Sequence, residues 1–189
     1  AASDVYKRQQ LLDVVPNAGH LGVADLERDF NVTVVTQNVD NLHERAGSTH
    51  VIHLHGELTK VCSSRDPYNP HFVKELAPEE YEVKLGDKAG DGTQLRPFIV
   101  WFGESVPEIE TAIRYVEQAD IFVIIGTSLN VYPAAGLLNY VPRAAEVYLI
   151  DPKPVDTHVM RPIHVIQKGA SEGVKELKAL LTATQPPLP

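Results

Sequence analysis

Two histidines separated by one residue, His53 and His55, have the side chains best suited to chemistry in this sequence. They fall in an apolar, β-branched run, 51–55, that predicts a strand, and in a strand both rings point to the same face. The pair fits three interpretations: a metal chelate completed by Cys62 or Glu57, a structural pair, or a single general base. The last interpretation follows because the unperturbed pKa of imidazole lies near neutrality.

Polar residues follow three other predicted strands at the point where each strand ends. The run 32–35 is followed by Gln37-Asn38-Val39-Asp40, the run 121–125 by Gly126-Thr127-Ser128, and the run 147–150 by Asp151. In open parallel sheets, ligands bind beyond the carboxyl ends of the strands. Small and hydroxyl residues there let backbone N–H groups approach a phosphate, and an acid suits ribose hydroxyls. Each segment alone also fits an ordinary turn, but the three together predict a nucleotide site.

The elements that must position these residues are short apolar runs alternating with helical patterns. Five runs are predicted as strands: 32–35, 51–55, 98–102, 121–125 and 147–150. Apolar residues at helical spacing predict helices over 109–116 and 171–181. This alternation predicts an α/β fold with a doubly wound parallel sheet. The polar segment 57–94, which contains several prolines and a glycine-rich turn, breaks the alternation and is predicted to be a small insert.

Composition excludes several classes of protein. The chain has 189 residues and a formal net charge of -8, which argues against a nucleic-acid partner. It has no apolar run of the roughly 18 residues that a membrane span needs, and no signal-peptide pattern, so we expect a soluble, cytoplasmic protein that does not bind membranes. Its single cysteine, Cys62, excludes an internal disulfide and a zinc site built from several cysteines.

Longer strings of residues resemble the sirtuins, a family of NAD-dependent protein-lysine deacylases. They are Thr36-Gln37-Asn38-Val39-Asp40-Asn41-Leu42-His43-Glu44-Arg45-Ala46-Gly47, His55-Gly56-Glu57-Leu58, Leu95-Arg96-Pro97, Val100-Trp101-Phe102-Gly103-Glu104, and Gly126-Thr127-Ser128-Leu129 with Val131-Tyr132-Pro133-Ala134-Ala135. The match runs in the family's order from about Gln10 to Leu181. Strings of this length do not agree by chance.

The resemblance implies a Rossmann-like fold, NAD as co-substrate, and roles for the matching positions. It implies that His55 is the general base for a ribose hydroxyl, with Asn38 and Asp40 beside the reacting ribose, and that His53 only supports its strand. The residues implied to bind NAD are Gln37, Asn38, Val39, Asp40, Gly126, Thr127, Ser128, Asp151 and Ala170. The residues implied to clamp an acyl-lysine peptide as an added strand are Val100, Phe102, Gly103, Glu104, Val131 and Tyr132. The acyl group would pass to ADP-ribose as nicotinamide leaves.

The cysteine content departs from the pattern of most sirtuins. Most members hold a structural zinc ion with four cysteines, whereas this sequence has only Cys62. We therefore expect no bound metal, as in a zinc-free, bacterial-type subgroup. Packing of apolar side chains in the insert is expected to offset the missing ion; the candidates are Tyr68, Phe72, Leu76 and Tyr81.

The N-terminal region departs as well, because nothing matches the family's first strand, its Gly-Ala-Gly phosphate loop or its acyl-contacting segment. Residues 4–9 resemble the translation of a transposon-type sequencing adapter, so we expect a truncated chain with a non-native leader at 1–9. We expect 10–56 with 95–189 to form the NAD-binding lobe, and 57–94 the insert.

Two other functions remain open. A chain without the phosphate loop is expected to be inactive alone, which makes a non-catalytic module that binds ADP-ribose, NAD or an acyl-peptide the main alternative. A metallohydrolase that uses His53 and His55 is a distant third interpretation.

Overall fold

The computed structural model describes residues 2–77, 80, 82–127, 134–154 and 161–183. The chain divides into two units, each formed by segments distant in sequence. The first unit comprises Ala1–Val15, Val35–Leu42 and His53–Val106, and the second comprises Pro16–Val34, His43–Ile52 and Pro107–Pro189. Within the described residues, no helix is both long and apolar enough to cross a membrane.

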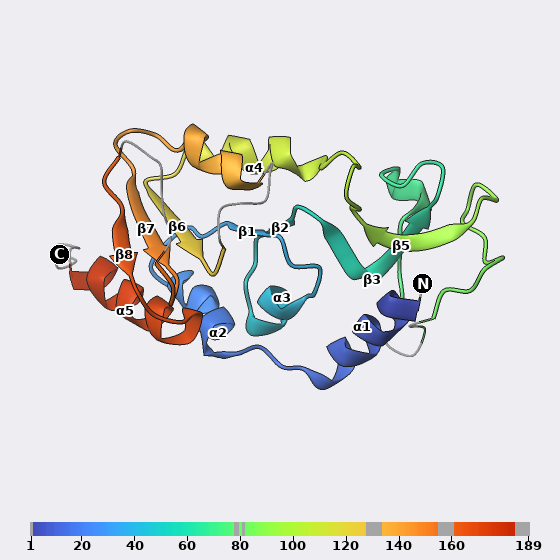
Figure 1. The fold of residues 1–189 in the computed structure, drawn as a ribbon, viewed down its shortest axis with the longest axis horizontal. Helices are drawn as coiled ribbons and strands as arrows, with labels where there is room; N and C mark the ends of the chain where they lie inside the picture. Colours follow the sequence, from blue (N-terminus) through green and yellow to red (C-terminus); the bar gives the residue numbers. More distant parts are fainter. Residues whose placement is uncertain (1, 78–79, 81, 128–133, 155–160, 184–189) are drawn as a thin grey trace. The chain divides into compact units, whose positions relative to one another are not determined.

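A parallel sheet forms the centre of the second unit (Figure 1). Its strands, in the order β6 (Ile121–Ile125), β7 (Glu146–Ile150) and β8 (His164–Ile166), are all parallel to their neighbours. β6 and β7 pair residue for residue from Ile121 opposite Glu146 to Ile125 opposite Ile150. Both strands are almost continuously apolar, as expected for parallel strands covered on two faces.

Helices cover this sheet on both sides (Figure 1). α2 (Ala18–Leu26) and α5 (Ala170–Ala183) lie on one side, and α4 (Glu108–Val116) with the 3-10 helix η2 (Ala134–Tyr140) lies on the other. The buried core on the α2–α5 side consists of Val23, Leu26, Tyr148, Ile150, Ile166, Val174, Leu177 and Leu181. The predicted α/β class with a parallel sheet is therefore confirmed.

The first unit is an antiparallel sheet. Its strands β3 (Gly56–Ser63), β4 (Lys74–Glu75) and β5 (Leu95–Ile99) lie in the order β4-β3-β5, and β3 and β5 pair with an irregularity between Glu57 and Val61. α1 (Ala2–Asp13) and the 3-10 helix η1 (Pro70–Phe72) complete the unit. The Arg8 side chain is buried and donates from Nε to the carbonyl of Leu58 at 2.6 Å.

One sequence prediction is corrected in this unit, and one strand was missed. The missed strand is β3, the central strand, most of which lies within 57–94; its buried and half-buried positions alternate only partly and form no apolar run. The predicted strand 98–102 ends at Ile99 and is antiparallel to β3, so it does not extend the parallel sheet. Arg96 and Pro97 obscure this strand in the sequence. The division into a lobe and an insert at 57 and 94 stays a prediction.

A third, two-stranded sheet pairs β1 (Val34–Thr36) with β2 (Val51–His53). In the second unit, Val34 N–H donates to His50 at 2.9 Å, and in the first unit Leu54 N–H donates to Thr36 at 3.0 Å. α3 (Leu42–Ala46) lies between the two strands in sequence. The predicted strands at 32–35 and 51–55 thus exist, but β1 starts two residues later and ends one residue later than predicted, and β2 ends two residues earlier.

Candidate active site

His55, the predicted general base, and His53, predicted to support its strand, are both held by carbonyl oxygens of the loop after β1. His55 Nδ1 lies 3.1 Å from the carbonyl of Gln37, and His53 Nδ1 lies 3.2 Å from the carbonyl of Asn38. A carbonyl oxygen only accepts hydrogen bonds, so each Nδ1 carries the proton when the ring is neutral. Nε2 of His55 therefore holds the lone pair, which is the form that a general base needs.

Hydrogen bonds fix the loop that carries these carbonyls. Thr36 Oγ1 accepts from Asn38 N–H at 3.0 Å, and Val39 accepts from Leu58 N–H at 2.8 Å. Asp40 Oδ1 accepts from the N–H of Leu42 at 3.1 Å, at the start of α3. The structure thus places Gln37, Asn38, Val39, Asp40 and His55 in the first unit and joins His55 to this loop through Gln37, while the binding roles of these residues stay predictions.

Gly56 sets the backbone immediately after His55. Its φ is +77°, and a Cβ at this position would lie 2.1 Å from the carbonyl oxygen of Phe98. Only glycine combines this conformation with so close an approach. The contact places β5 against the turn at His55, whose carbonyl accepts from Val100 N–H at 3.0 Å.

The segment predicted to bind peptide, Val100–Glu104, is a turn in the structure. Glu104 N–H donates to the carbonyl of Trp101 at 3.0 Å, and Gly103, the third residue of this turn, has a φ of +90°. A type II turn needs a positive φ at that position, which explains the glycine. Phe102 is fully exposed at the tip.

The remaining NAD-binding candidates lie in the second unit, at the carboxyl ends of its parallel strands. Gly126 follows β6 with a φ of +61° and donates to Ile150 at 2.9 Å, and Thr127 is half-buried beside it in sequence. Asp151 follows β7, and its Oδ1 accepts from Lys153 N–H at 2.8 Å. Ala170 begins α5. Ser128, Val131 and Tyr132 lie outside the described residues.

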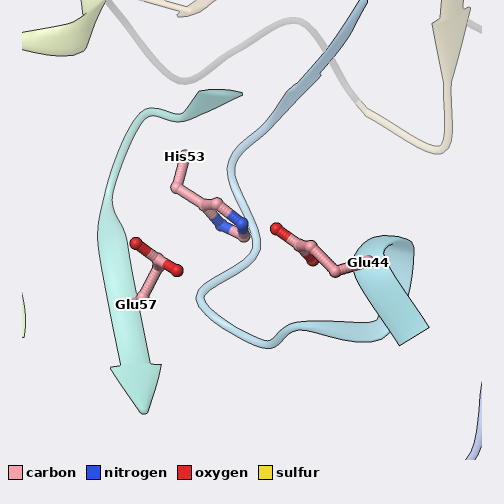
Figure 2. Close-up of side chains that lie close together, drawn as sticks. All are labelled: Glu44, His53 and Glu57. Carbon is pink, nitrogen blue, oxygen red and sulfur yellow. The ribbon is translucent and has the colours of Figure 1, made fainter. Parts of the chain in front are cut away.

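The structure also bears on the metal interpretation of the histidine pair. Figure 2 shows His53 and Glu57 on the path from β2 into β3; Glu44, also labelled, belongs to the second unit. The Glu57 carboxylate pairs with Lys60 Nζ at 2.6 Å. Cys62 is fully buried, and burial raises the pKa of its thiol to about 11, which opposes formation of the thiolate in the absence of a metal. The expectation of no bound metal stays a prediction.

Comparisons with known proteins establish the family. Residues 3–133 match the model described as the Sir2 family. The chain belongs to the Sir2 family. An NAD-dependent protein deacylase of Bacteroides thetaiotaomicron is 82% identical over 175 residues, which cover 93% of this chain and 75% of the relative.

Two solved structures have the same fold. A complex of a Sir2 homologue with NAD is 34% identical, with a TM-score of 0.80, and the match covers 96% of this chain and 71% of that one. A Sir2–p53 peptide–NAD+ complex is 27% identical, with a TM-score of 0.73 and coverage of 93% and 74%. The predicted sirtuin membership and Rossmann-like fold are confirmed, whereas the roles of individual residues stay predictions.

One residue beside this site has a role that the sequence does not reveal. Arg96 lies in the string Leu95-Arg96-Pro97, and its guanidinium binds the carboxylate of Glu104. The sequence signal was weak: opposite charges eight residues apart, on either side of two exposed aromatic residues. Such a pair is recognised only when the backbone between the two charges is seen to turn back.

Proposed function

We propose that this Sir2-family chain is an NAD-dependent protein-lysine deacylase that transfers the acyl group to ADP-ribose and releases nicotinamide. The observation that carries the proposal is the geometry of His55, whose Nδ1–H is held by the Gln37 carbonyl and whose Nε2 bears the lone pair. This orientation is what a base for a ribose hydroxyl requires. The similarity to NAD-dependent protein deacylases supports the same reaction.

The residues that would hold NAD fit its chemistry. The turn at Gly126 is exposed, and apart from its chain neighbours no atom of the described residues lies within 4 Å of the place that a Cβ would take there, so a phosphate or ribose can reach its backbone. The N-terminus of α5, at Ala170, supplies N–H groups and a favourable dipole for anions. Asp151 supplies a carboxylate for ribose hydroxyls, and Gln37, Asn38, Val39 and Asp40 supply polar groups for nicotinamide and its ribose.

In the mechanism, NAD supplies an electrophilic ribose carbon and a leaving nicotinamide. His55 Nε2 accepts the proton of a ribose hydroxyl, which makes that oxygen nucleophilic. The Gln37 carbonyl keeps the ring oriented and stabilises the imidazolium that forms, because it continues to accept from Nδ1–H. Asn38 and Asp40 stabilise positive charge at the ribose carbon through their oxygen atoms.

We propose that the second substrate is an acyl-lysine peptide or protein. Val100, Phe102, Gly103 and Glu104 would bind its backbone at the exposed turn after β5, together with Val131 and Tyr132. Binding through the backbone gives affinity with little demand on sequence. The peptide in a solved Sir2 complex supports this substrate class. We expect no nucleic-acid partner, because the net charge of the chain is negative. The cytoplasmic location stays a prediction from the sequence.

A nicotinamide-release assay with NAD and an acetyl-lysine peptide tests the function. Turnover by the wild-type chain would contradict the expectation from its sequence that it is inactive alone. Where the wild type turns over, His55→Ala should lower the rate by about 10²–10⁴-fold, as is typical when a general base is removed. His53→Ala is the matched control, because it removes a second carbonyl-held imidazole and should change the rate far less. Thermal stabilisation by ADP-ribose without any turnover would instead support the non-catalytic binding module.

We also propose that the first unit is held without zinc. The Ser63 hydroxyl donates to Asp91 Oδ2 at 2.7 Å, lies 2.9 Å from Thr93 Oγ1, and accepts from the N–H groups of Arg65 and Asp66. These bonds join the end of β3 to the turn 91–93. Elemental analysis should find much less than one zinc per chain, and a chelator should leave the melting temperature unchanged. Stoichiometric zinc would contradict the proposal.

A further inference from the structure

Arg96 and Glu104 form a bidentate ion pair at the base of the turn that follows β5. Arg96 Nη1 donates to Glu104 Oε1 at 2.7 Å, and Nη2 donates to Oε2 at 3.0 Å. The guanidinium also donates to the carbonyl of Ile99 at 2.7 Å, and the carboxylate accepts from Trp101 N–H at 3.0 Å. Because such bidentate pairs are directional, this one cross-links both ends of the turn.

This turn is tied to the backbone of the proposed base. Val100 N–H donates to the His55 carbonyl at 3.0 Å. The next residue after His55 is Gly56, which makes the close contact with the carbonyl of Phe98. On the other side, the Tyr68 hydroxyl donates to the carbonyl of Ser105 at 3.1 Å. The position of the turn relative to His55 therefore depends on the bonds at its two ends.

The tip of the turn presents backbone groups to solvent. Phe102 is fully exposed, and Trp101 is 45% exposed. The N–H groups of Val100, Trp101 and Glu104 are used inside the protein, whereas those of Phe102 and Gly103 have no partner among the described residues. Two adjacent free donors are suited to the carbonyl oxygens of an extended peptide.

The ion pair is partly buried at some cost. The Arg96 and Glu104 side chains are 20% and 33% exposed, and Nε of Arg96 is buried without a partner among the described residues. An unpaired buried donor is destabilising, and a pair removed from water is weak support for stability. Each partner favours the charged form of the other: the pKa of Arg96 is raised and the pKa of Glu104 is lowered. A contribution to stability does not account for this arrangement, whereas a role in positioning the turn 100–104 does.

We propose that Arg96 is a positioning residue for the acyl-lysine peptide. Acting through Glu104, it holds the turn 100–104 so that the free N–H groups of Phe102 and Gly103 keep a fixed place relative to His55. The inference rests on the proposed function, because the acyl-lysine peptide is the substrate of that reaction. Arg96 does not itself act on the reacting atoms.

The only tryptophan of the chain, Trp101, lies on this turn and reports on it directly. We would titrate the full chain with an acetyl-lysine peptide, in the presence of ADP-ribose, and follow tryptophan fluorescence. Acrylamide quenching would measure how accessible Trp101 is to solvent, which increases when the turn is less well held. Arg96→Gln removes both the positive charge and the bidentate pairing with Glu104, whereas Arg96→Lys keeps the charge but loses the bidentate pairing. Lys60→Gln is the matched control, because it removes another half-buried ion pair of the same sheet.

We expect Arg96→Gln to weaken peptide binding and raise the peptide KM by roughly 10–100-fold, the scale of a small misplacement at a reaction site, while the KM for NAD changes little. Quenching should increase in Arg96→Gln, recover partly in Arg96→Lys, and stay unchanged in Lys60→Gln. Unchanged peptide affinity and quenching in Arg96→Gln would overturn the proposal, and so would a parallel loss of stability, NAD binding and peptide binding. A wild-type chain that binds the peptide without releasing nicotinamide would refute the proposed function alone.

Discussion

The two units of this Sir2-family chain are stabilised by different interactions. The second unit buries apolar strands and helices around Ile150, Val174 and Leu177, each at most 1% exposed. The first unit buries a smaller apolar group that includes Leu54 and Val61, and it adds the hydroxyl network at Ser63 and the ion pair between Arg96 and Glu104. Gly56 adds a close backbone approach that no other residue type permits.

The two units therefore differ in what their contacts do: those of the second unit mainly stabilise the fold, and those of the first unit fix the positions of particular atoms. Apolar burial is not directional, so it stabilises the second unit without fixing any one polar group. Hydrogen bonds and bidentate pairs are directional, and in the first unit they orient the His55 ring and close the turn at Trp101. The proposed chemistry therefore lies where directional contacts are concentrated.

The largest expected effect on folding is in the apolar unit. Leu177→Ala should lower the free energy of unfolding by about 2–5 kcal/mol, because it removes a fully buried side chain and leaves a cavity between α5 and the sheet. Denaturant unfolding would measure the change, and hydrogen exchange would locate it in α5 and β7. A loss below about 0.5 kcal/mol would show that this core is loosely packed.

A smaller loss of stability, with a larger loss of activity, is expected from Gly56→Ala. A residue with a Cβ in this conformation costs about 1–3 kcal/mol of backbone strain, and the carbonyl of Phe98 must also move. Because His55 precedes this position, nicotinamide release should fall more than unfolding accounts for. Gly86→Ala is the control, since Gly86 also has a positive φ but open space around it. Equal activity in Gly56→Ala and Gly86→Ala would show that the close approach of Gly56 to Phe98 does not position His55.

The smallest effect is expected in the polar network, and it should depend on pH. Hydrogen bonds from Thr93 and Ser63 lower the pKa of Asp91 from 3.8 to about 2. A lowered pKa stabilises the fold above the unfolded value of 3.8, and this contribution is lost as the pH falls toward 2. Asp91→Asn should therefore lower the denaturation midpoint at pH 7, and the difference from wild type should shrink below about pH 4.

The matched control for this pH dependence lies in the second unit. The pKa of Asp25 is also lowered, chiefly by its hydrogen bond from Lys178, and both side chains are half-buried. Solvent and salt still reach and screen this ion pair, so Asp25→Asn should shift the midpoint less than Asp91→Asn does. A larger shift for Asp25→Asn would reverse the assigned importance of the two networks.

The sequence by itself determined the family, the α/β class and much of the second unit. β6 was predicted at its observed bounds, and β7, α4 and α5 within a few residues, because apolar periodicity is a local signal that survives without tertiary information. Candidate residues for the site were also predicted from the sequence, but only as separate strings. Their positions along the chain carry no information on the distances between them.

Only the tertiary structure decided how those strings meet. Pairing of β3 with β5, the carbonyl of Gln37 on His55, and the folding back of Glu104 onto Arg96 each join residues that are not neighbours in sequence. β3 was missed because its alternating pattern is weak, and 98–102 was predicted as a strand because aromatic and β-branched residues favour strands wherever they occur. Local propensity sets which elements can form, whereas long-range hydrogen bonds and close packing select where each one ends and which atoms it presents.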